Sequence, residues 1–322
     1  MNMAIVEKIN HLRRERDAVI LAHYYQRAEI QDLADFVGDS LALSRTAAGT
    51  RAKVIVFCGV DFMAETAAIL CPDRIVLHPD PSSGCPMADM CSARELRELK
   101  ARVPDAKVIC YVNSSAEVKA ESDICCTSSN AAAIMARFGN DVPLIFVPDR
   151  WLGEYTARKA GRTNLRWANA SGGDMKEEGS GAPVYLWSGY CPTHHHILPE
   201  FVERMKAEHP SAMVAVHPEC RREITAMADF VGSTAQILEY CQASPATEFI
   251  IGTEIGILHP LRVANPGKTF YIATPIAECP NMKLITLEKL LWALEDCAPR
   301  VIVEPKLAAA ARIPISRMLQ RI

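Results

Sequence analysis

The stretch "ADFVGDS" at residues 34–40 returns as "ADFVGST" at residues 228–234. A related stretch, "SDICCTSS", stands between them at residues 122–129. Each one follows an apolar run that ends in polar residues, and these runs are "AVILAHYY", "KVICYVN" and "MVAVHPE". One match of this kind means little, but an ordered set of matches indicates internal repeats. The stretch therefore predicts three homologous units along the chain.

The three units agree in the spacing of their residues as well as in residue identity. As anchors we take the polar residues at the ends of the apolar runs: His23, Tyr111 and His217. A polar pair follows each anchor by 16 and 17 residues: Asp39 and Ser40, Thr127 and Ser128, Ser233 and Thr234. An acidic residue follows by 38 residues in the first two units and by 37 in the third: Asp61, Asp149 and Glu254.

Each unit closes with a cysteine–proline pair, whose cysteines are Cys85, Cys191 and Cys279. Cys85 and Cys279 both lie 62 residues after their anchors, whereas Cys191 lies 80 residues after its own. The longer spacing fits an insertion near residues 161–182, where the polar, glycine-rich "NASGGDMKEEGSGA" predicts an exposed loop. Cys91 also lies close to the first pair, but its spacing does not match that of Cys279, so Cys85 is preferred.

The whole chain alternates short apolar runs with helical stretches. Runs such as "KVIVFCG", "PLIFVPD" and "EFIIGTE" are typical of buried parallel strands. We therefore predict an α/β fold of three homologous units, each with a parallel sheet, packed around a pseudo-threefold axis with a central site. The predicted domains are residues 1–105 with an N-terminal helix, residues 106–210 with the insertion, and residues 211–322 with C-terminal helices.

Composition excludes several classes of protein. The net charge of -3 over 322 residues leaves no basic footprint, so we expect no nucleic-acid partner. No apolar run reaches the roughly 18 residues that span a bilayer, and the N-terminus reads as an amphipathic helix, so we expect a cytoplasmic protein without membrane contact. The 12 cysteines include no C-x-x-C pair, so zinc ribbons and thioredoxin-like motifs are excluded and most cysteines should be reduced and buried.

The three equivalent cysteines predict a shared metal site. Ligands bind outside the carboxyl ends of parallel strands, so three units around one axis would bring Cys85, Cys191 and Cys279 together. A proline suits the first position of a helix, and a thiolate is favoured beside such a start. Three thiolates suit a [4Fe–4S] cluster with one open iron, or a Cys3His zinc site completed from the adjoining "THHH" run. The spacing leaves both alternatives open.

The remaining repeat positions favour an anionic substrate. Hydroxyl and N–H groups at helix starts bind carboxylate or phosphate. Three hydroxyl residues stand at predicted helix starts: Ser40, Ser128 and Thr234. Six further polar residues end the three first strands: His23, Tyr25, Tyr111, Asn113, His217 and Glu219. The alternative for any one hydroxyl residue is that it only caps a helix.

Ten motifs, in order from about residue 17 to 300, resemble those of the quinolinate synthase family. They are "AHYYQ…GDS", "GCPMADM", "CYVNSSAEVKAESD", "CCTSSNA", "PDRWLG", "GYCPTHH", "VHPEC", "GSTAQI", "IGTEIGILH" and "ECPNMK". The resemblance implies three αβα domains around a central [4Fe–4S] cluster. It also implies a transferase of NAD biosynthesis, which condenses iminoaspartate with dihydroxyacetone phosphate to quinolinate, phosphate and water. A transient contact with the enzyme that supplies iminoaspartate would follow.

The resemblance implies roles residue by residue. Cys85, Cys191 and Cys279 would bind the cluster and leave one iron open. Tyr25 and Glu219 would handle protons, and His194 would lie near the phosphate or an intermediate, whereas His195 and His196 would have no such role. Eight residues would hold the substrates: His23, Ser40, Tyr111, Asn113, Ser128, His217, Glu219 and Thr234. Some relatives carry C-x-x-C-x-x-C near the last ligand, where this chain has only Cys279, so thiol regulation tied to that element is not expected.

Two other functions remain as alternatives at this stage. The histidine run would suit a zinc-dependent aldolase or hydratase with Cys3His ligation. A non-catalytic iron–sulfur sensor would use the same cysteines and would need a surface for a partner.

Overall fold

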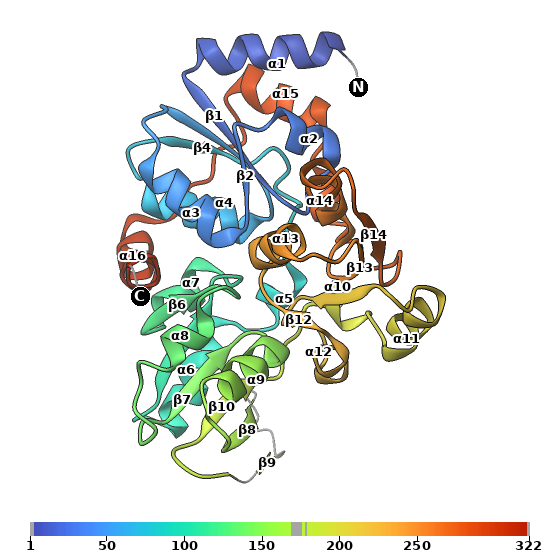
Figure 1. The fold of residues 1–322 in the computed structure, drawn as a ribbon. Helices are drawn as coiled ribbons and strands as arrows, with labels where there is room; N and C mark the ends of the chain where they lie inside the picture. Colours follow the sequence, from blue (N-terminus) through green and yellow to red (C-terminus); the bar gives the residue numbers. More distant parts are fainter. Residues whose placement is uncertain (1–2, 169–175, 178, 321–322) are drawn as a thin grey trace.

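The computed structural model describes residues 3–168, 176–177 and 179–320 (Figure 1). Within these residues the chain forms three separate sheets, one in each predicted unit. The predicted loop at 169–182 lies largely outside the described residues. In Figure 1 the first unit lies above the second, and the third lies to one side of both. The predicted α/β class with three parallel sheets is confirmed.

The three sheets share one strand order. The first is β2 (Phe36–Gly38), β1 (Ala18–His23), β3 (Val54–Cys58) and β4 (Ile75–Leu77). The second is β6 (Ile124–Cys126), β5 (Lys107–Tyr111), β7 (Leu144–Val147) and β10 (Val184–Trp187), extended by β8 (Leu165–Ala168) and β9 (Lys176–Glu177). The third is β12 (Phe230–Val231), β11 (Met213–Val216), β13 (Glu248–Gly252) and β14 (Thr269–Ile272). All pairs are parallel except the pair of β8 and β9.

The repeated stretch forms the first edge of each sheet. Asp35 accepts a hydrogen bond from the backbone N–H of Ile20 at 2.8 Å and returns one from its own N–H to the Ile20 carbonyl at 2.9 Å. Asp123 makes the same two bonds with Val108, and Asp229 makes them with Val214. This reciprocal pairing holds a strand of two or three residues against its neighbour. It gives a physical reason for the recurrence of the aspartate.

The first sheet lies between two helical layers. On one face Ile20 and Ala22 of β1 pack in a cluster with residues of α1 (Met3–Glu15) and α15 (Leu287–Asp296). On the other face Leu21 packs in a cluster with residues of α3 (Ser40–Gly49) and α4 (Asp61–Leu70). Alternate residues of one strand therefore enter two different cores, as expected for a sheet buried on both faces.

The other two units follow the same plan. In the third unit Val214 and Val216 share a cluster with residues of α11 (Pro199–Glu208) and α12 (Arg222–Met227). The opposite face carries α13 (Thr234–Ala243) and α14 (Leu258–Ala264). In the second unit α9 (Arg150–Lys159) packs on β7, β8 and β10, and α8 (Ala131–Met135) packs on α9. Further helices of the first two units include α2 (Ala28–Leu33), α6 (Ala93–Arg102) and α7 (Ala116–Ala120).

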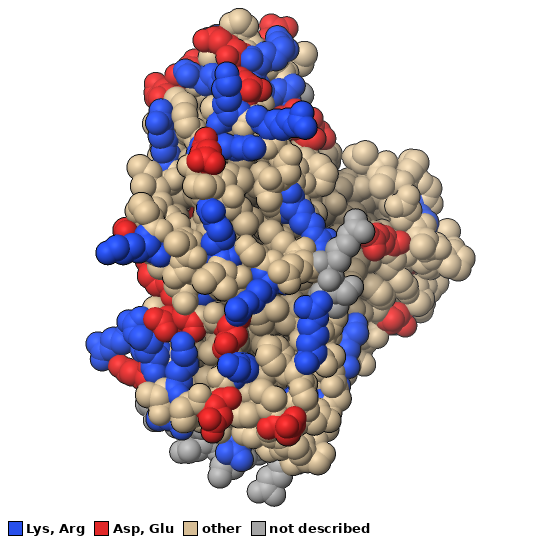
Figure 2. Space-filling view, turned by 90° about the vertical axis from the view of Figure 1, so that its left-hand side faces the viewer, with Lys and Arg blue, Asp and Glu red and all other residues tan. Residues whose placement is uncertain are grey.

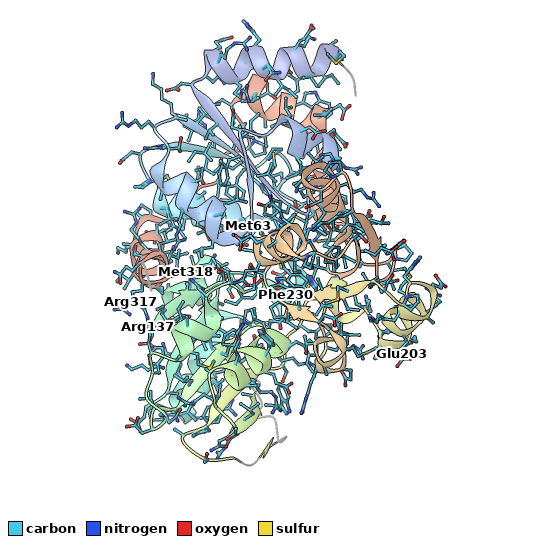
Figure 3. The ribbon with its side chains drawn as sticks, viewed as in Figure 1. Met63, Arg137, Glu203, Phe230, Arg317 and Met318 are labelled. Carbon is cyan, nitrogen blue, oxygen red and sulfur yellow. The ribbon has the colours of Figure 1, made fainter. Side chains whose placement is uncertain are left out.

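The C-terminal helices return to the first two units. Helix α15 packs on α1 and β3, and α16 (Pro305–Leu319) packs against α4, α7 and β6. Figure 3 labels Arg317 and Met318 on α16, where this helix meets the second unit. Arg317 donates to the carbonyl of Asp123, and the Met318 carbonyl accepts from the side chain of Asn130. The sequence after the third sheet thus joins the other two units, and the predicted domain boundaries stay a prediction.

One face of the molecule carries charged side chains of both signs (Figure 2). On the face drawn in Figure 2, Lys and Arg side chains are interspersed with Asp and Glu. None of the helices in the part of the chain that the structure describes is both long and apolar enough to cross a membrane.

Candidate active site

The carboxyl ends of the three sheets border one cavity of about 150 Å³. Cys85 follows β4, Cys191 follows β10 and Cys279 follows β14, so each cysteine comes after the strand at the fourth position of the shared strand order. All three line the cavity. The shared strand order therefore brings equivalent chain positions to one place, as expected for ligand sites in parallel sheets.

The other residues singled out from the sequence line the same cavity. They are His23, Tyr25, Ser40, Tyr111, Asn113, Ser128, His194, His217, Glu219 and Thr234. The structure thus brings every predicted site residue together. Their individual roles stay predictions.

Two of the three cysteines stand at helix starts. Cys85 precedes α5 (Pro86–Asp89) and Cys191 precedes α10 (Pro192–His195), with a proline at the first helical position in both cases. The same expectation is wrong for Pro280, because the next helix, the 3-10 helix η2 (Met282–Leu284), begins only after Asn281. Burial is the largest cause that raises the pKa of Cys85, Cys191 and Cys279, and it outweighs the backbone N–H groups nearby that lower it.

Acidic residues at repeat-equivalent positions hold two of the cysteines. The carboxylate of Asp149 accepts from the backbone N–H of Cys191 at 3.0 Å, and Glu254 accepts from that of Cys279 at 3.1 Å. Both carboxylates are fully buried, and burial raises their pKa. Asp61, the equivalent residue of the first unit, binds the N–H of Phe62. Two of the three acidic residues therefore fix the backbone of the predicted ligands.

Two histidines lie in matching turns. The ring Nδ1 of His23 accepts from the N–H of Tyr25 at 3.1 Å, and Nδ1 of His217 accepts from the N–H of Glu219 at 3.3 Å. Burial is the largest cause that lowers the pKa of both rings to about 3, so they are neutral at pH 7. A neutral ring whose Nδ1 accepts carries its proton on Nε2. His23 and His217 can therefore donate that proton to an oxygen in the cavity, as His217 can to Ser128 at 3.2 Å.

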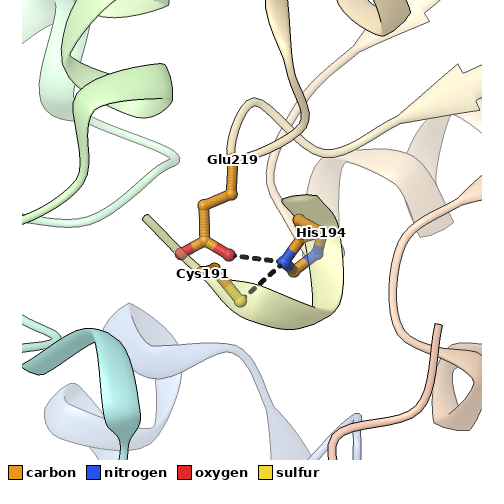
Figure 4. Close-up of side chains that lie close together, drawn as sticks. All are labelled: Cys191, His194 and Glu219. Carbon is orange, nitrogen blue, oxygen red and sulfur yellow. Dashed lines mark hydrogen bonds and ion pairs between the residues drawn. The ribbon is translucent and has the colours of Figure 1, made fainter. Parts of the chain in front are cut away.

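A chain of short contacts joins the three predicted catalytic residues. Glu219 Oε2 lies 2.7 Å from His194 Nδ1, and His194 Nε2 lies 2.8 Å from Thr253 Oγ1. Thr253 Oγ1 in turn lies 2.6 Å from the Tyr25 hydroxyl, which also accepts from Thr234 at 3.0 Å. Figure 4 shows the first part of this chain, with dashed lines that join His194 to Glu219 and to Cys191. The arrangement can relay a proton between the carboxylate and the phenol.

Burial sets the charge states along this chain. Burial first, and then the Glu219 carboxylate, raise the pKa of Tyr25 and Tyr111 well above 10, so both phenols stay protonated. Burial alone would raise the pKa of Glu219, but His194 and His217 outweigh it and lower that pKa. The site therefore holds an ionised carboxylate and protonated phenols at neutral pH, which is the pairing that proton transfer in both directions requires.

Two polar atoms at the cavity have no hydrogen-bond partner among the described residues. They are Oε1 of Glu219 and Oδ1 of Asn113. Buried polar atoms are normally paired, so unpaired ones that face a cavity suit a ligand. Ser40 and Thr234 begin the ten-residue helices α3 and α13, where backbone N–H groups favour an anion.

His195 lies outside the cavity and has a structural role. Its ring Nδ1 accepts from the indole N–H of Trp151 at 3.1 Å, and Arg221 donates to its carbonyl at 2.8 Å. This side chain links α9 to the turn before α12. His196 is exposed and also lies away from the cavity.

Thr253 is the functional candidate that sequence reasoning missed. It is completely buried, and it contacts the two predicted catalytic residues Tyr25 and His194. The equivalent positions in the other units are Val60 and Pro148, so the repeat provides no polar signal there. Its only sequence clue is that it immediately precedes Glu254.

Comparisons with known proteins agree on one family. A family model described as "Quinolinate synthetase A protein" matches residues 7–320. A quinolinate synthase of Desulforudis audaxviator is 49% identical over 315 residues, covering 98% of this chain and 97% of the relative. A quinolinate synthase of Dehalococcoides mccartyi (strain CBDB1) is 49% identical, covering 98% of both chains. One from Methanosarcina barkeri is 47% identical, covering 98% of this chain and 97% of the relative.

Proposed function

The chain belongs to the quinolinate synthetase A family, and from this premise we infer that it is an enzyme that makes quinolinate. The membership confirms the resemblance drawn from the ten motifs. We propose that it condenses iminoaspartate with dihydroxyacetone phosphate and releases phosphate and water, as a cytoplasmic step of NAD biosynthesis. A transient contact with the enzyme that supplies iminoaspartate belongs to the same proposal.

One observation carries this proposal: three equivalent cysteines border one cavity together with every predicted substrate-binding residue. The cysteines also fit a cluster better than a single ion. Among the described residues, one group of three or more His, Cys, Asp and Glu side chains has ligand atoms within 4.8 Å of one another, and it contains only Cys191 of the three. A single zinc ion would need all its ligand atoms that close, whereas a [4Fe–4S] cluster binds its cysteines at separate corners.

Cys85, Cys191 and Cys279 would hold the cluster, which when bound supplies a Lewis-acidic iron that polarises an oxygen of the substrate. No lysine or arginine is found among the described residues that line the cavity. The substrate anions would therefore be held by neutral donors. These are the Nε2–H groups of His23 and His217, the hydroxyls of Ser40, Ser128 and Thr234, and the side chains of Tyr111 and Asn113.

Proton transfer would fall to the chain that begins at Glu219. Glu219 is the ionised group and would act as general base, since it lines the cavity and its Oε1 has no hydrogen-bond partner among the described residues. Tyr25 keeps its proton at neutral pH and would return it to the substrate. His194 contacts Glu219 directly and is joined to Tyr25 by the Thr253 hydroxyl. It would carry the proton between these two residues, or donate a hydrogen bond to the phosphate or to an intermediate.

The test is anaerobic purification followed by metal and sulfide analysis, an absorption spectrum and a quinolinate assay with both substrates. We expect about four irons per chain, brown protein and quinolinate formation. Cys191→Ala should lose the cluster and the activity while the fold, followed by circular dichroism, is retained. Colourless protein with stoichiometric zinc and full activity would refute the proposal.

Two other functions are less well supported. A zinc-dependent aldolase or hydratase with Cys3His ligation would need three sulfur atoms and a histidine at one ion, and that group is not formed by the described residues. Activity that survives air and returns on adding zinc would favour it. A non-catalytic iron–sulfur sensor would bind a cluster without making quinolinate.

A further inference from the structure

The cavity contains a second arrangement of ligand atoms that the cluster proposal does not use. Sγ of Cys191 lies 3.2 Å from Nδ1 of His194, and the same nitrogen lies 2.7 Å from Oε2 of Glu219 (Figure 4). These three ligand atoms lie within 4.8 Å of one another. We propose that the cluster-free protein binds one zinc ion at Cys191, His194 and Glu219.

The chemistry of the three donors selects the metal. A thiolate, an imidazole and a carboxylate form a mixed set that suits zinc, whereas magnesium and calcium prefer oxygen ligands alone. A tetrahedral zinc ion with usual bond lengths places sulfur and nitrogen ligands about 3.5 Å apart. The present Sγ–Nδ1 separation is about 0.3 Å shorter, and the Nδ1–Oε2 separation is about 0.6 Å shorter than the roughly 3.3 Å of tetrahedral nitrogen and oxygen ligands. Small rotations of the side chains would open them to accept the ion.

The surroundings of the three residues support the site. Glu219 is 3% exposed, and its second oxygen, Oε1, has no hydrogen-bond partner among the described residues. His194 is 1% exposed, and its other ring nitrogen lies 2.8 Å from the Thr253 hydroxyl. A metal-bound imidazole typically donates its second N–H to such an acceptor, which fixes the ring. Thr253 therefore already holds His194 in the orientation that exposes Nδ1 to the ion.

The charge of the cavity lining and the access to the cavity also support a zinc site. The charged residues lining the cavity are acidic in the part of the chain that the structure describes: Asp39, Glu219 and Glu254. Glu254 already pairs with Lys283 at 2.8 Å, so a divalent cation would offset the charge of Glu219 and Asp39. Three protein ligands leave a fourth tetrahedral position that faces the cavity and would take a water molecule.

A zinc ion at this site would affect the loading of the cluster, a consequence that rests on the proposed function. Cys191 would serve both the zinc ion and the [4Fe–4S] cluster, so the two would exclude each other. Zinc would occupy the centre until cluster assembly displaces it. Zinc bound before assembly should therefore slow the loading of iron and sulfide.

The test uses full-length protein stripped of iron by a chelator and titrated with cobalt(II), then with zinc in competition. Cobalt reports thiolate ligation and tetrahedral geometry through its absorption bands. We expect one ion per chain and one thiolate ligand. Cys191→Ala should abolish binding, and His194→Gln and Glu219→Gln should each weaken it more than about tenfold, since even changes outside the ligand shell cost this much.

Matched controls separate this site from its rivals. Cys85→Ala and Cys279→Ala should bind zinc with wild-type affinity, because their sulfurs lie outside the group. His196→Ala removes an exposed member of the same histidine run and should also change nothing. The proposal is overturned if Cys85→Ala weakens binding as much as Cys191→Ala, if His194→Gln binds normally, if His196→Ala abolishes binding, or if no saturable binding occurs.

Failure of this inference and failure of the proposed function give different results. Reconstitution of the same wild-type protein with iron and sulfide, followed by absorption and a quinolinate assay, tests the function alone. Zinc binding with the expected variant pattern but no cluster would refute the function and leave the zinc site standing. A normal cluster without zinc binding would refute the zinc site and leave the proposed function standing. Zinc-loaded protein that loads iron at the rate of the zinc-free form, while retaining its zinc, would contradict the competition.

Discussion

The side-chain oxygen of Thr253 lies 2.6 Å from the phenol oxygen of Tyr25, between two residues predicted to transfer protons. On its other side it lies 2.8 Å from His194 Nε2. Thr253 itself does not line the cavity. It is therefore a positioning residue, which holds two polar side chains from different units at the cavity.

Thr253→Val keeps the shape of the side chain and removes the hydroxyl. We expect kcat to fall at least about tenfold with a smaller change in KM, because positioned proton transfer contributes roughly 10²–10⁴-fold. Thr253→Ser restores the hydroxyl and should recover most of the rate. The measurement is anaerobic steady-state quinolinate formation at equal cluster content. A valine variant with normal kcat, or a serine variant as slow as the valine one, would contradict the assignment.

Asp149 should control the placement of Cys191. Asp149→Ala leaves the buried N–H groups of Cys191 and Leu152 without their acceptor, which costs roughly 1–3 kcal/mol for each group. We expect lower stability and less iron and sulfide per chain after anaerobic reconstitution. Asp149→Asn keeps one acceptor oxygen and should lose less.

Asp61→Ala is the matched control, since Asp61 occupies the equivalent position but binds the N–H of Phe62 and not that of Cys85. Its cluster content should stay near the wild-type value. Equal loss of cluster in the Asp61 and Asp149 variants would show that the backbone bond to Cys191 is not the cause.

The sequence predicted most of the fold because a threefold repeat is visible in it. Spacing alone placed the three cysteines and the polar strand ends in one cavity, since equivalent positions converge when three sheets share a strand order. The edge strands β2, β6 and β12 were not predicted, because strands of two or three residues have too little periodicity. They depend on long-range bonds from Asp35, Asp123 and Asp229.

What the sequence did not predict depends on contacts between units. Thr253 has no polar counterpart in the other units, and its function follows only from its contacts with Tyr25 and His194. The helix expected at Pro280 is absent, since the chain there forms no helix until η2 begins after Asn281. The packing of α16 across the first two units likewise has no local signal, since its partners lie more than a hundred residues away.

His23 should make the stability of the cluster-free protein depend on pH. Its pKa is lowered from 6.5 to about 3, chiefly by burial. Between pH 7.5 and 5.5 the unfolded chain therefore gains a proton at this residue and the folded chain does not, so stability falls as pH falls. The expected loss from this residue is about 1.4 kcal/mol.

Other groups titrate in the same range, so the measurement is a difference. Urea unfolding of wild-type protein and of His23→Gln at both pH values isolates the contribution of His23. The wild type should lose about 1.4 kcal/mol more than the variant. Parallel pH profiles for the two proteins would show that His23 has an ordinary pKa in the folded state.

Met318 should tie the C-terminal helix to the first two units. It is completely buried on α16, while its neighbour Arg317 is exposed (Figure 3). Met318→Ala leaves a cavity between α16 and the second unit, and we expect a loss of about 2–4 kcal/mol in the free energy of unfolding. Arg317→Ala loses one exposed hydrogen bond to the Asp123 carbonyl and should cost less than about 1 kcal/mol. Urea unfolding measures the free energy of unfolding of both variants. Similar losses for the two would mean that α16 is held by its surface bonds and not by its buried face.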